Sequence, residues 1–252
     1  RARRPRPDEA AEPRDQSRAA SEALRQLVHE LRTPTNAIAG FAELIETQLL
    51  GPVALPYRQQ AAAIRSHTLA LIGAIDDLDT AARIAGHALE LRPASVAVEP
   101  LVARVLADLA PLARLRGAGI AFSPGDDHHA QVDDRAAERL IGRLLAALVA
   151  AAGQGERLRL KVKTKPAATI AIQIDRPVAL AAIGDEALFA IDAPSDVGAE
   201  PIEGAPLLGT GFALRLARNL AVELGGSLTI GADRLTLRLP AALNQEVGQA
   251  AQ

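Results

Sequence analysis

Two apolar stripes with helical spacing, separated by a short run of helix breakers, constrain the fold of this chain more than any other feature. The first begins at residue 16 and repeats every three or four positions, at Leu24, Leu27, Val28, Leu31, Ala37, Ile38, Phe41, Leu44 and Ile45. The second runs from residue 57 to about residue 84 and includes Ile64, Leu71, Ile75 and Leu78. Residues 48–56 contain a glycine and two prolines. The pattern predicts two long helices joined as an antiparallel hairpin.

The hairpin is expected to pair with a second copy of itself. Pro34 interrupts the first stripe, but the stripe resumes beyond it, so we expect a kink in the helix and not its end. Aromatic residues are only 2% of the chain, so the core is built from small aliphatic side chains that suit close helix packing. A lone hairpin cannot bury such wide apolar faces, and a dimeric four-helix bundle can.

Composition excludes several classes of function. A net charge of -2 argues against broad binding to nucleic acid or to an anionic membrane. The absence of cysteine excludes disulfides, thiolate metal sites and cysteine nucleophiles. No apolar run is long enough for a membrane span, and no signal peptide is recognisable. Because the sequence does not begin with Met, we interpret it as a cytoplasmic fragment of something longer.

The second half alternates between strand and helix patterns. Strands are expected at residues 89–92, 95–98, 120–122, 131–132, 158–163, 169–175, 227–230 and 234–239. Helices are expected at residues 100–115, 135–152 and 209–224. A turn is expected at residues 165–166 and a long loop at residues 184–208. The order predicts an α+β sandwich with helices layered on a mixed or antiparallel sheet.

The most informative motif lies on the first helix. It reads His-Glu-Leu-Arg-Thr-Pro at residues 29–34 and continues to Gly-Phe-Ala-Glu at residues 40–43. This stretch closely resembles the phospho-acceptor box of sensor histidine kinases of two-component systems. The resemblance implies a linker (1–15), a dimerisation and histidine phosphotransfer hairpin (16–87), an ATPase-like α/β sandwich domain (88–242) and a C-terminal tail (243–252).

The chemistry of the motif is coherent. His29 on an exposed helix face offers a neutral ring nitrogen that can attack a phosphoryl group. Glu30 is placed to orient the ring or accept its proton. Thr33 lies about one turn further on the same face, where its hydroxyl could position a water. The alternative is a surface histidine on an amphipathic helix. We expect the other four histidines, at positions 67, 87, 128 and 129, to be solvated, and we expect no metal site.

The nucleotide motifs of the family are matched less closely. The resemblance implies ATP and Mg²⁺ as cofactors, but the family's Mg²⁺-binding asparagine falls on Ala147, which has no ligand atom. The family's Asp-x-Gly-x-Gly keeps Asp175, the residue that would contact adenine, and has Pro177 and Ala179 in place of the glycines. Gly209 and Gly211 begin a helix as the family's phosphate-facing segment does.

The resulting hypothesis is a histidine kinase core in which His29 exchanges a phosphoryl group with the aspartate of a response-regulator receiver domain. The receiver is expected to dock near residues 37–44. Two mechanisms remain open: autophosphorylation from ATP, which family membership favours, and ATP-independent relay or removal of phosphate, which the missing site residues favour. The alternative from another class is a non-catalytic dimeric scaffold that regulates a partner by binding.

Overall fold

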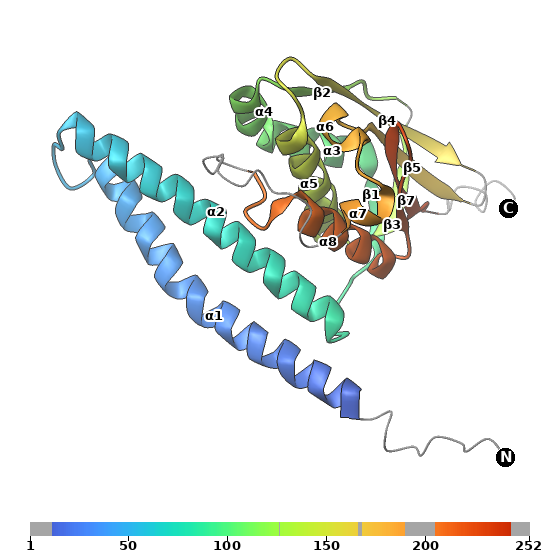
Figure 1. Ribbon diagram of the computed structural model, residues 1–252, viewed down its shortest axis with the longest axis horizontal. Coiled ribbons are helices and arrows are strands. Elements are labelled where there is room, and N and C mark those ends of the chain that lie inside the picture. Colours follow the sequence, from blue (N-terminus) through green and yellow to red (C-terminus); the bar gives the residue numbers. More distant parts are fainter. Residues whose placement is uncertain (1–11, 126, 166–167, 190–204, 243–252) are drawn as a thin grey trace, which may run out of the picture. The chain divides into compact units, whose positions relative to one another are not determined.

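The chain folds into two compact units, residues 1–90 and residues 91–252. The structure is a computed structural model that describes residues 12–125, 127–165, 168–189 and 205–242 (Figure 1). The predicted turn at residue 166, most of the predicted loop at 184–208, most of the 1–15 linker and the 243–252 tail lie outside the described residues. The limits predicted for the functional domains stay a prediction.

The first unit is an antiparallel hairpin of α1 (Glu12–Glu46) and α2 (Leu55–Ala85). α1 begins at Glu12, inside the stretch that the sequence had assigned to the linker, and continues through Pro34. α2 begins with a proline in its first turn, where the missing N–H has no helical partner in any case. Polar contacts fix the register of the two helices: Arg32 pairs with Asp76, and Arg65 pairs with Glu46.

The second unit is built on a mixed sheet. The elements are β1 (Ala94–Ala97), α3 (Val98–Asp108), α4 (Ala110–Arg116), β2 (Gly119–Phe122), β3 (His129–Val132), α5 (Asp134–Ala151), β4 (Arg157–Lys165), β5 (Thr169–Asp175), α6 (Val178–Ala181), α7 (Asp185–Leu188), α8 (Gly209–Glu223), β6 (Ser227–Ile230) and β7 (Arg234–Pro240). Five strands form a sheet in the order β2-β4-β5-β7-β6, and β1 pairs with β3 in a small second sheet. Only β2 and β4 run parallel within the five-stranded sheet. The predicted fold class is confirmed.

The two faces of the large sheet differ in polarity. One face carries buried aliphatic side chains, and in Figure 1 α5 and α8 lie beside the sheet. In register these side chains include Leu160, Ile174 and Leu235, which are neighbours across β4, β5 and β7. The other face carries the alternate positions of β4, which are all basic and exposed: Arg157, Arg159, Lys161, Lys163 and Lys165. Period-two alternation thus separates an apolar core face from a cationic outer face.

Glycine is required where α8 meets β7. Gly225, the residue after the C-cap of α8, has a φ of 73°. A Cβ on Gly226 would lie closer than 3.0 Å to the backbone oxygen of Arg238, a separation that real Cβ atoms essentially never show. The close approach of the two backbones at Gly226 depends on the absence of a side chain.

Three details of the predicted secondary structure were wrong. Residues 89–92 are not a strand, because the Arg92 N–H donates to the side chain of Asp133 and Pro93, which follows, has no N–H. The single helix expected at 100–115 is two helices, α3 and α4, because Pro111 cannot donate to the carbonyl one turn earlier. The short helices α6 and α7 were not expected.

Candidate phospho-acceptor site on the helical hairpin

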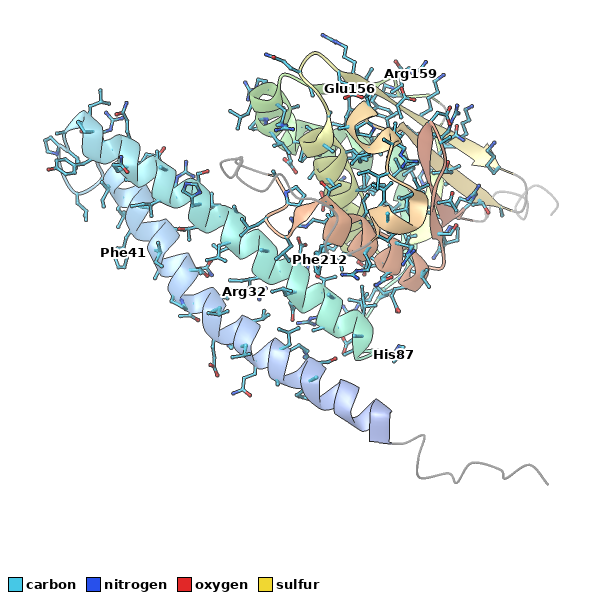
Figure 2. The ribbon with its side chains drawn as sticks, in the orientation of Figure 1. Arg32, Phe41, His87, Glu156, Arg159 and Phe212 are labelled. Carbon is cyan, nitrogen blue, oxygen red and sulfur yellow. The ribbon has the colours of Figure 1, made fainter. Side chains whose placement is uncertain are left out.

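His29 is exposed on α1, on a different flank of the helix from the apolar stripe. Val28, the preceding residue, is buried against α2, and this contact fixes the rotation of α1. Leu27 and Leu31 lie on the flank away from His29 and are exposed. Phe41, one of the exposed apolar side chains of α1, points away from α2 (Figure 2). The hairpin therefore presents its histidine on one flank and a row of uncovered apolar side chains on another.

The two residues predicted to assist His29 lie close to it along α1. Glu30 is exposed, and its carboxylate accepts a hydrogen bond from the side-chain amide of Gln26 at 3.1 Å. Thr33 is exposed one turn beyond His29. The next threonine, Thr35, is instead buried, and its hydroxyl donates to the backbone oxygens of Leu31 and Arg32. Thr33 is thus the threonine whose hydroxyl is open to solvent near the histidine.

Pro34 changes the backbone of the turn that carries His29. Proline has no N–H, so the carbonyl of Glu30, four residues earlier, has no helical donor. The helix nonetheless remains continuous across this point. A carbonyl acceptor without its helical donor therefore lies one residue from His29.

A cleft of about 310 Å³ lies beside His29, between α1 and α2. Its lining includes Arg25 and Arg32 from α1, and Asp79 and Arg83 from α2. Arg32 is bonded to Asp76 and lies between the two helices (Figure 2). Sequence reasoning missed this cleft. The spacing of Arg25 and Arg32 from His29, four residues before and three after, signals a shared face. Arg83 could be found only from the register of the hairpin.

The residues predicted to bind nucleotide are distributed over the second unit. Asp175 ends β5, and one of its carboxylate oxygens accepts from Arg159 Nε at 2.7 Å and from the Arg159 backbone N–H at 3.1 Å. By strand alternation, Asp175 lies on the cationic outer face of the sheet, with Ile174 on the core face. Burial raises the pKa of the Asp175 carboxyl, but the hydrogen bonds and charge of Arg159 outweigh burial and lower that pKa below 3.8.

Gly209 and Gly211 lie in the first turn of α8, as predicted from the sequence. Gly209 has a φ of 83°, and its N–H donates to the backbone oxygen of Pro206 at 3.1 Å. Gly211 is buried. Ala147, on the neighbouring helix α5, has no exposed surface.

The segment after Asp175 is a short helix held by two charged side chains. The buried guanidinium of Arg176 donates to the backbone oxygens of Gly231, Leu180 and Ile183. Glu156 accepts the Val178 N–H at 2.9 Å (Figure 2 labels Glu156). These bonds anchor α6, which contains Ala179 and directly follows Pro177, to the β6–β7 hairpin and to the start of β4.

Of the remaining histidines, His128 differs from expectation. It is 8% exposed, and its Nδ1 bonds to the carboxylate of Glu99, which also accepts the His128 backbone N–H at 3.2 Å. The prediction of a solvated residue was wrong, because the loop closes onto the start of α3. Among the described residues, no group of three or more His, Asp or Glu is arranged to hold a metal ion. None of the described helices is long and apolar enough to cross a membrane.

Comparison with known proteins agrees with the hairpin geometry. Residues 19–86 match the family described as His Kinase A (phospho-acceptor) domain. Histidine protein kinase DivJ of Caulobacter vibrioides is 26% identical over 248 residues, covering 91% of this chain and 40% of that protein. Cell-division control histidine kinase PdhS of Brucella ovis is 33% identical over 97 residues, covering 37% of this chain and 9% of its own. The chain thus spans well under half the length of these relatives.

Two solved structures share the fold. Full-length ShkA, solved in complex with AMPPNP, superposes with a TM-score of 0.63 at 21% identity, over 88% of this chain and 46% of its own. Histidine kinase AdeS of Acinetobacter baumannii superposes with a TM-score of 0.52 at 15% identity, over 85% of this chain and 98% of its own. The predicted resemblance is confirmed: residues 19–86 match the His Kinase A (phospho-acceptor) domain, and the chain is homologous to the histidine kinases DivJ and PdhS.

Proposed function

We propose that this chain is a homodimeric phosphotransfer core in which His29 carries a phosphoryl group and exchanges it with the aspartate of a response-regulator receiver domain. The observation that carries this proposal is the division of the hairpin surface. An exposed histidine beside an arginine-lined cleft lies on one flank, and uncovered apolar side chains lie on another. The first flank can meet a phosphorylated partner while the second is covered by a second copy of the chain.

The dimer accounts for the apolar side chains that a single hairpin leaves uncovered. On α1 the large exposed residues include Leu27, Leu31, Ile38 and Ile45, and on α2 they include Tyr57, Ile64 and Leu71. The α2 residues are spaced by seven, the heptad repeat of helices that pack along a seam. Exposed apolar surface of this extent on a soluble hairpin favours self-association.

The proposed reaction transfers one phosphoryl group between nitrogen and oxygen. A neutral ring nitrogen of His29 attacks the phosphorus of an aspartyl phosphate, a P–N bond forms, and the P–O bond breaks to release the carboxylate. Glu30 orients the ring or takes its proton, and Thr33 positions a water when phosphate is removed. The receiver domain docks near residues 37–44 and the facing part of α2.

We further propose that ATP use is weak or lost. Ala147 offers no oxygen to Mg²⁺ and is fully buried. Asp175 is engaged by Arg159 on the outer face of the sheet, and Arg176 and Glu156 hold the segment that carries glycines in the family. The residues present do not fit Mg²⁺-ATP, so no step of the proposed mechanism passes through it. Autophosphorylation from ATP is the competing mechanism, supported by Gly209, Gly211 and homology to kinases.

A phosphotransfer assay tests the role of His29. The purified chain is incubated with receiver domains that carry labelled aspartyl phosphate, and transfer to the chain is measured. The wild type and the His67→Ala variant should be labelled, and His29→Ala should not, because His67 is also exposed on the hairpin but lacks the cleft. Equal labelling of the His29→Ala variant would contradict the role of His29, and no labelling of the wild type would favour the scaffold alternative.

Calorimetric titration tests the proposal that ATP use is weak or lost. Titration of the chain with ATP and Mg²⁺ should give no heat of binding at micromolar concentrations. Labelled ATP without a phosphorylated partner should leave His29 unlabelled. Low-micromolar affinity would contradict the proposed loss of ATP binding, and labelling that is lost in His29→Ala would establish the competing kinase mechanism.

A further inference from the structure

The cleft beside His29 is lined by three guanidinium groups. Arg25, Arg32 and Arg83 line it, against the carboxylates of Glu22 and Asp79. Arg83 donates to Asp79 at 2.8 Å, and Arg32 bonds to Asp76. Arg25 has no ion-pair partner among the side chains that the structure describes. The cleft therefore contains a guanidinium that makes no ion pair, next to an exposed imidazole.

Helix geometry directs the His29 ring toward this guanidinium. Helical side chains lean toward the N-terminus of the helix and cover the turn that precedes their own Cα. For His29 this is the turn that carries Arg25, and Arg83 lines the same cleft from α2. A phosphoryl group on the ring would enter a space bounded by cations from two helices.

We propose that Arg25 and Arg83 form a phosphoryl-binding clamp that holds the phosphorylated side chain of His29 in this cleft and slows its hydrolysis. The proposal rests on the proposed role of His29 as phosphoryl carrier and assigns to the same site two residues that lie outside its phospho-acceptor motif. Guanidinium groups suit this task because their planar donors bind phosphoryl oxygens in pairs. Asp79 holds Arg83 in place through the ion pair between adjacent turns of α2.

The clamp slows hydrolysis through charge. In hydrolysis the P–N bond breaks, the oxygen of water bonds to phosphorus, and the proton of water passes to the ring nitrogen. The transition state is loose, and the phosphoryl oxygens carry less negative charge in it than in the bound dianion. Two guanidinium groups therefore stabilise phosphohistidine more than they stabilise the transition state, and the phosphoryl group persists until a partner carboxylate accepts it.

Chemical phosphorylation tests the clamp without ATP or a protein partner. The full chain is treated with phosphoramidate, which phosphorylates exposed histidines directly, and the decay of each phosphohistidine is followed by intact-mass and peptide-mass analysis. His67 serves as a histidine without the clamp in the same molecule. The variants are Arg25→Gln, Arg25→Lys and Arg83→Gln, with Arg58→Gln near the other end of α2 as the matched control.

Phospho-His29 should outlive phospho-His67. Arg25→Gln and Arg83→Gln should each shorten its lifetime about threefold, the effect of one partly exposed charge pair. Arg25→Lys should restore part of the lifetime, and Arg58→Gln should leave it unchanged, with thermal unfolding of the hairpin unaltered in each variant. Equal lifetimes at the two histidines, no effect of the arginine variants, or labelling of His67 but not His29 would each overturn the clamp.

The lifetime measurement and the phosphotransfer assay test different proposals. If the arginine variants shorten the lifetime but a receiver domain does not exchange phosphate with the chain, the clamp stands and the proposed function fails. If exchange occurs but the lifetimes do not respond to Arg25 or Arg83, the function stands and the clamp fails.

Discussion

Arg159 on β4 holds Asp175 on β5 through two hydrogen bonds to one carboxylate oxygen, from Nε at 2.7 Å and from the backbone N–H at 3.1 Å. The pKa of the Asp175 carboxyl is lowered from 3.8. A lowered folded-state pKa means that Asp175 stabilises the second unit above about pH 3.8, and that this stabilisation is lost as the pH falls through the folded-state pKa. The pair therefore links β4 to β5 most strongly at neutral pH.

Asp175→Asn should consequently destabilise the second unit slightly at pH 7 and have less effect at pH 3. Urea unfolding at both pH values, followed by circular dichroism, measures the difference. Asp108→Asn, at the exposed C-terminus of α3, is the matched control and should show no such loss at pH 7. An equal effect of Asp175→Asn at both pH values would mean that the carboxylate charge does not contribute.

Asp133 caps α5, and its removal should lower the free energy of unfolding more than the removal of Asp175. Its Oδ1 accepts the Ala136 N–H at 2.9 Å, and its Oδ2 accepts the Arg92 N–H at 3.0 Å. Burial raises the pKa of Asp133, but these backbone hydrogen bonds and the charge of Arg135 outweigh it and lower the pKa from 3.8. Asp133→Ala should cost about 1–2 kcal/mol of unfolding free energy at pH 7.

Asp133→Asn provides the comparison. The amide oxygen can still accept from Ala136, but its NH₂ cannot accept from Arg92, so the loss should be smaller than for alanine. Because the folded-state pKa of Asp133 is lowered, the stabilisation that depends on its charge is present above about pH 3.8 and disappears at lower pH. Urea midpoints of both variants equal to that of the wild type at pH 7 would show that the cap does not contribute.

Gly226→Ala should be strongly destabilising, because its Cβ would meet the backbone oxygen of Arg238 and the strand cannot move without breaking its pairing with β6. We expect a loss of about 3 kcal/mol or more. Gly142→Ala is the control. Gly142 lies inside α5, where a Cβ would meet only a Val105 methyl at 3.9 Å, so alanine should stabilise by up to about 1 kcal/mol. Thermal unfolding of both variants gives the comparison, and a tolerated Gly226→Ala would contradict the close approach.

The contributions of the buried residues Glu99 and His128 to the stability of the second unit should be coupled. Glu99→Ala leaves the ring and the backbone N–H of His128 without this acceptor, in a site where both side chains are under 10% exposed. The loss of unfolding free energy should be about 2 kcal/mol, because removing the acceptor leaves buried donors without a hydrogen-bond partner. The double variant Glu99→Ala/His128→Ala should cost less than the sum of the single variants by at least about 1 kcal/mol. If the losses of unfolding free energy in this double-mutant cycle, measured in urea, are additive, the two side chains contribute independently.

Periodicity predicted the hairpin and the order of most elements of the second unit, because burial of one face imposes a repeat on the sequence. Contacts that depend on register were not predictable. The bond of Arg159 to Asp175 follows only once β4 and β5 are aligned, and the place of Arg83 beside His29 follows only once α1 and α2 are aligned. His128 was misjudged because the sequence does not reveal that Glu99 lies within bonding distance.

The part of the candidate site that lies on one helix was predictable, and the part that depends on the alignment of distant segments was not. His29, Glu30 and Thr33 are neighbours along one helix, so spacing alone places them together. Gly209 and Gly211 are likewise adjacent at a helix start. Asp175 is distant in sequence, and its side chain follows the alternation of β5 to the outer face of the sheet. The roles predicted for these residues stay predictions.

The basic outer face of β4 implies an unusual response of the second unit to ionic strength. Side chains on one face of a strand repeat about every 7 Å, so neighbouring cations from Arg157 to Lys165 repel one another. At 0.1 M salt the Debye length is about 10 Å, and further salt screens this repulsion. Added sodium chloride should therefore raise the melting temperature of the second unit, even though the same salt weakens the ion pair of Arg159 with Asp175.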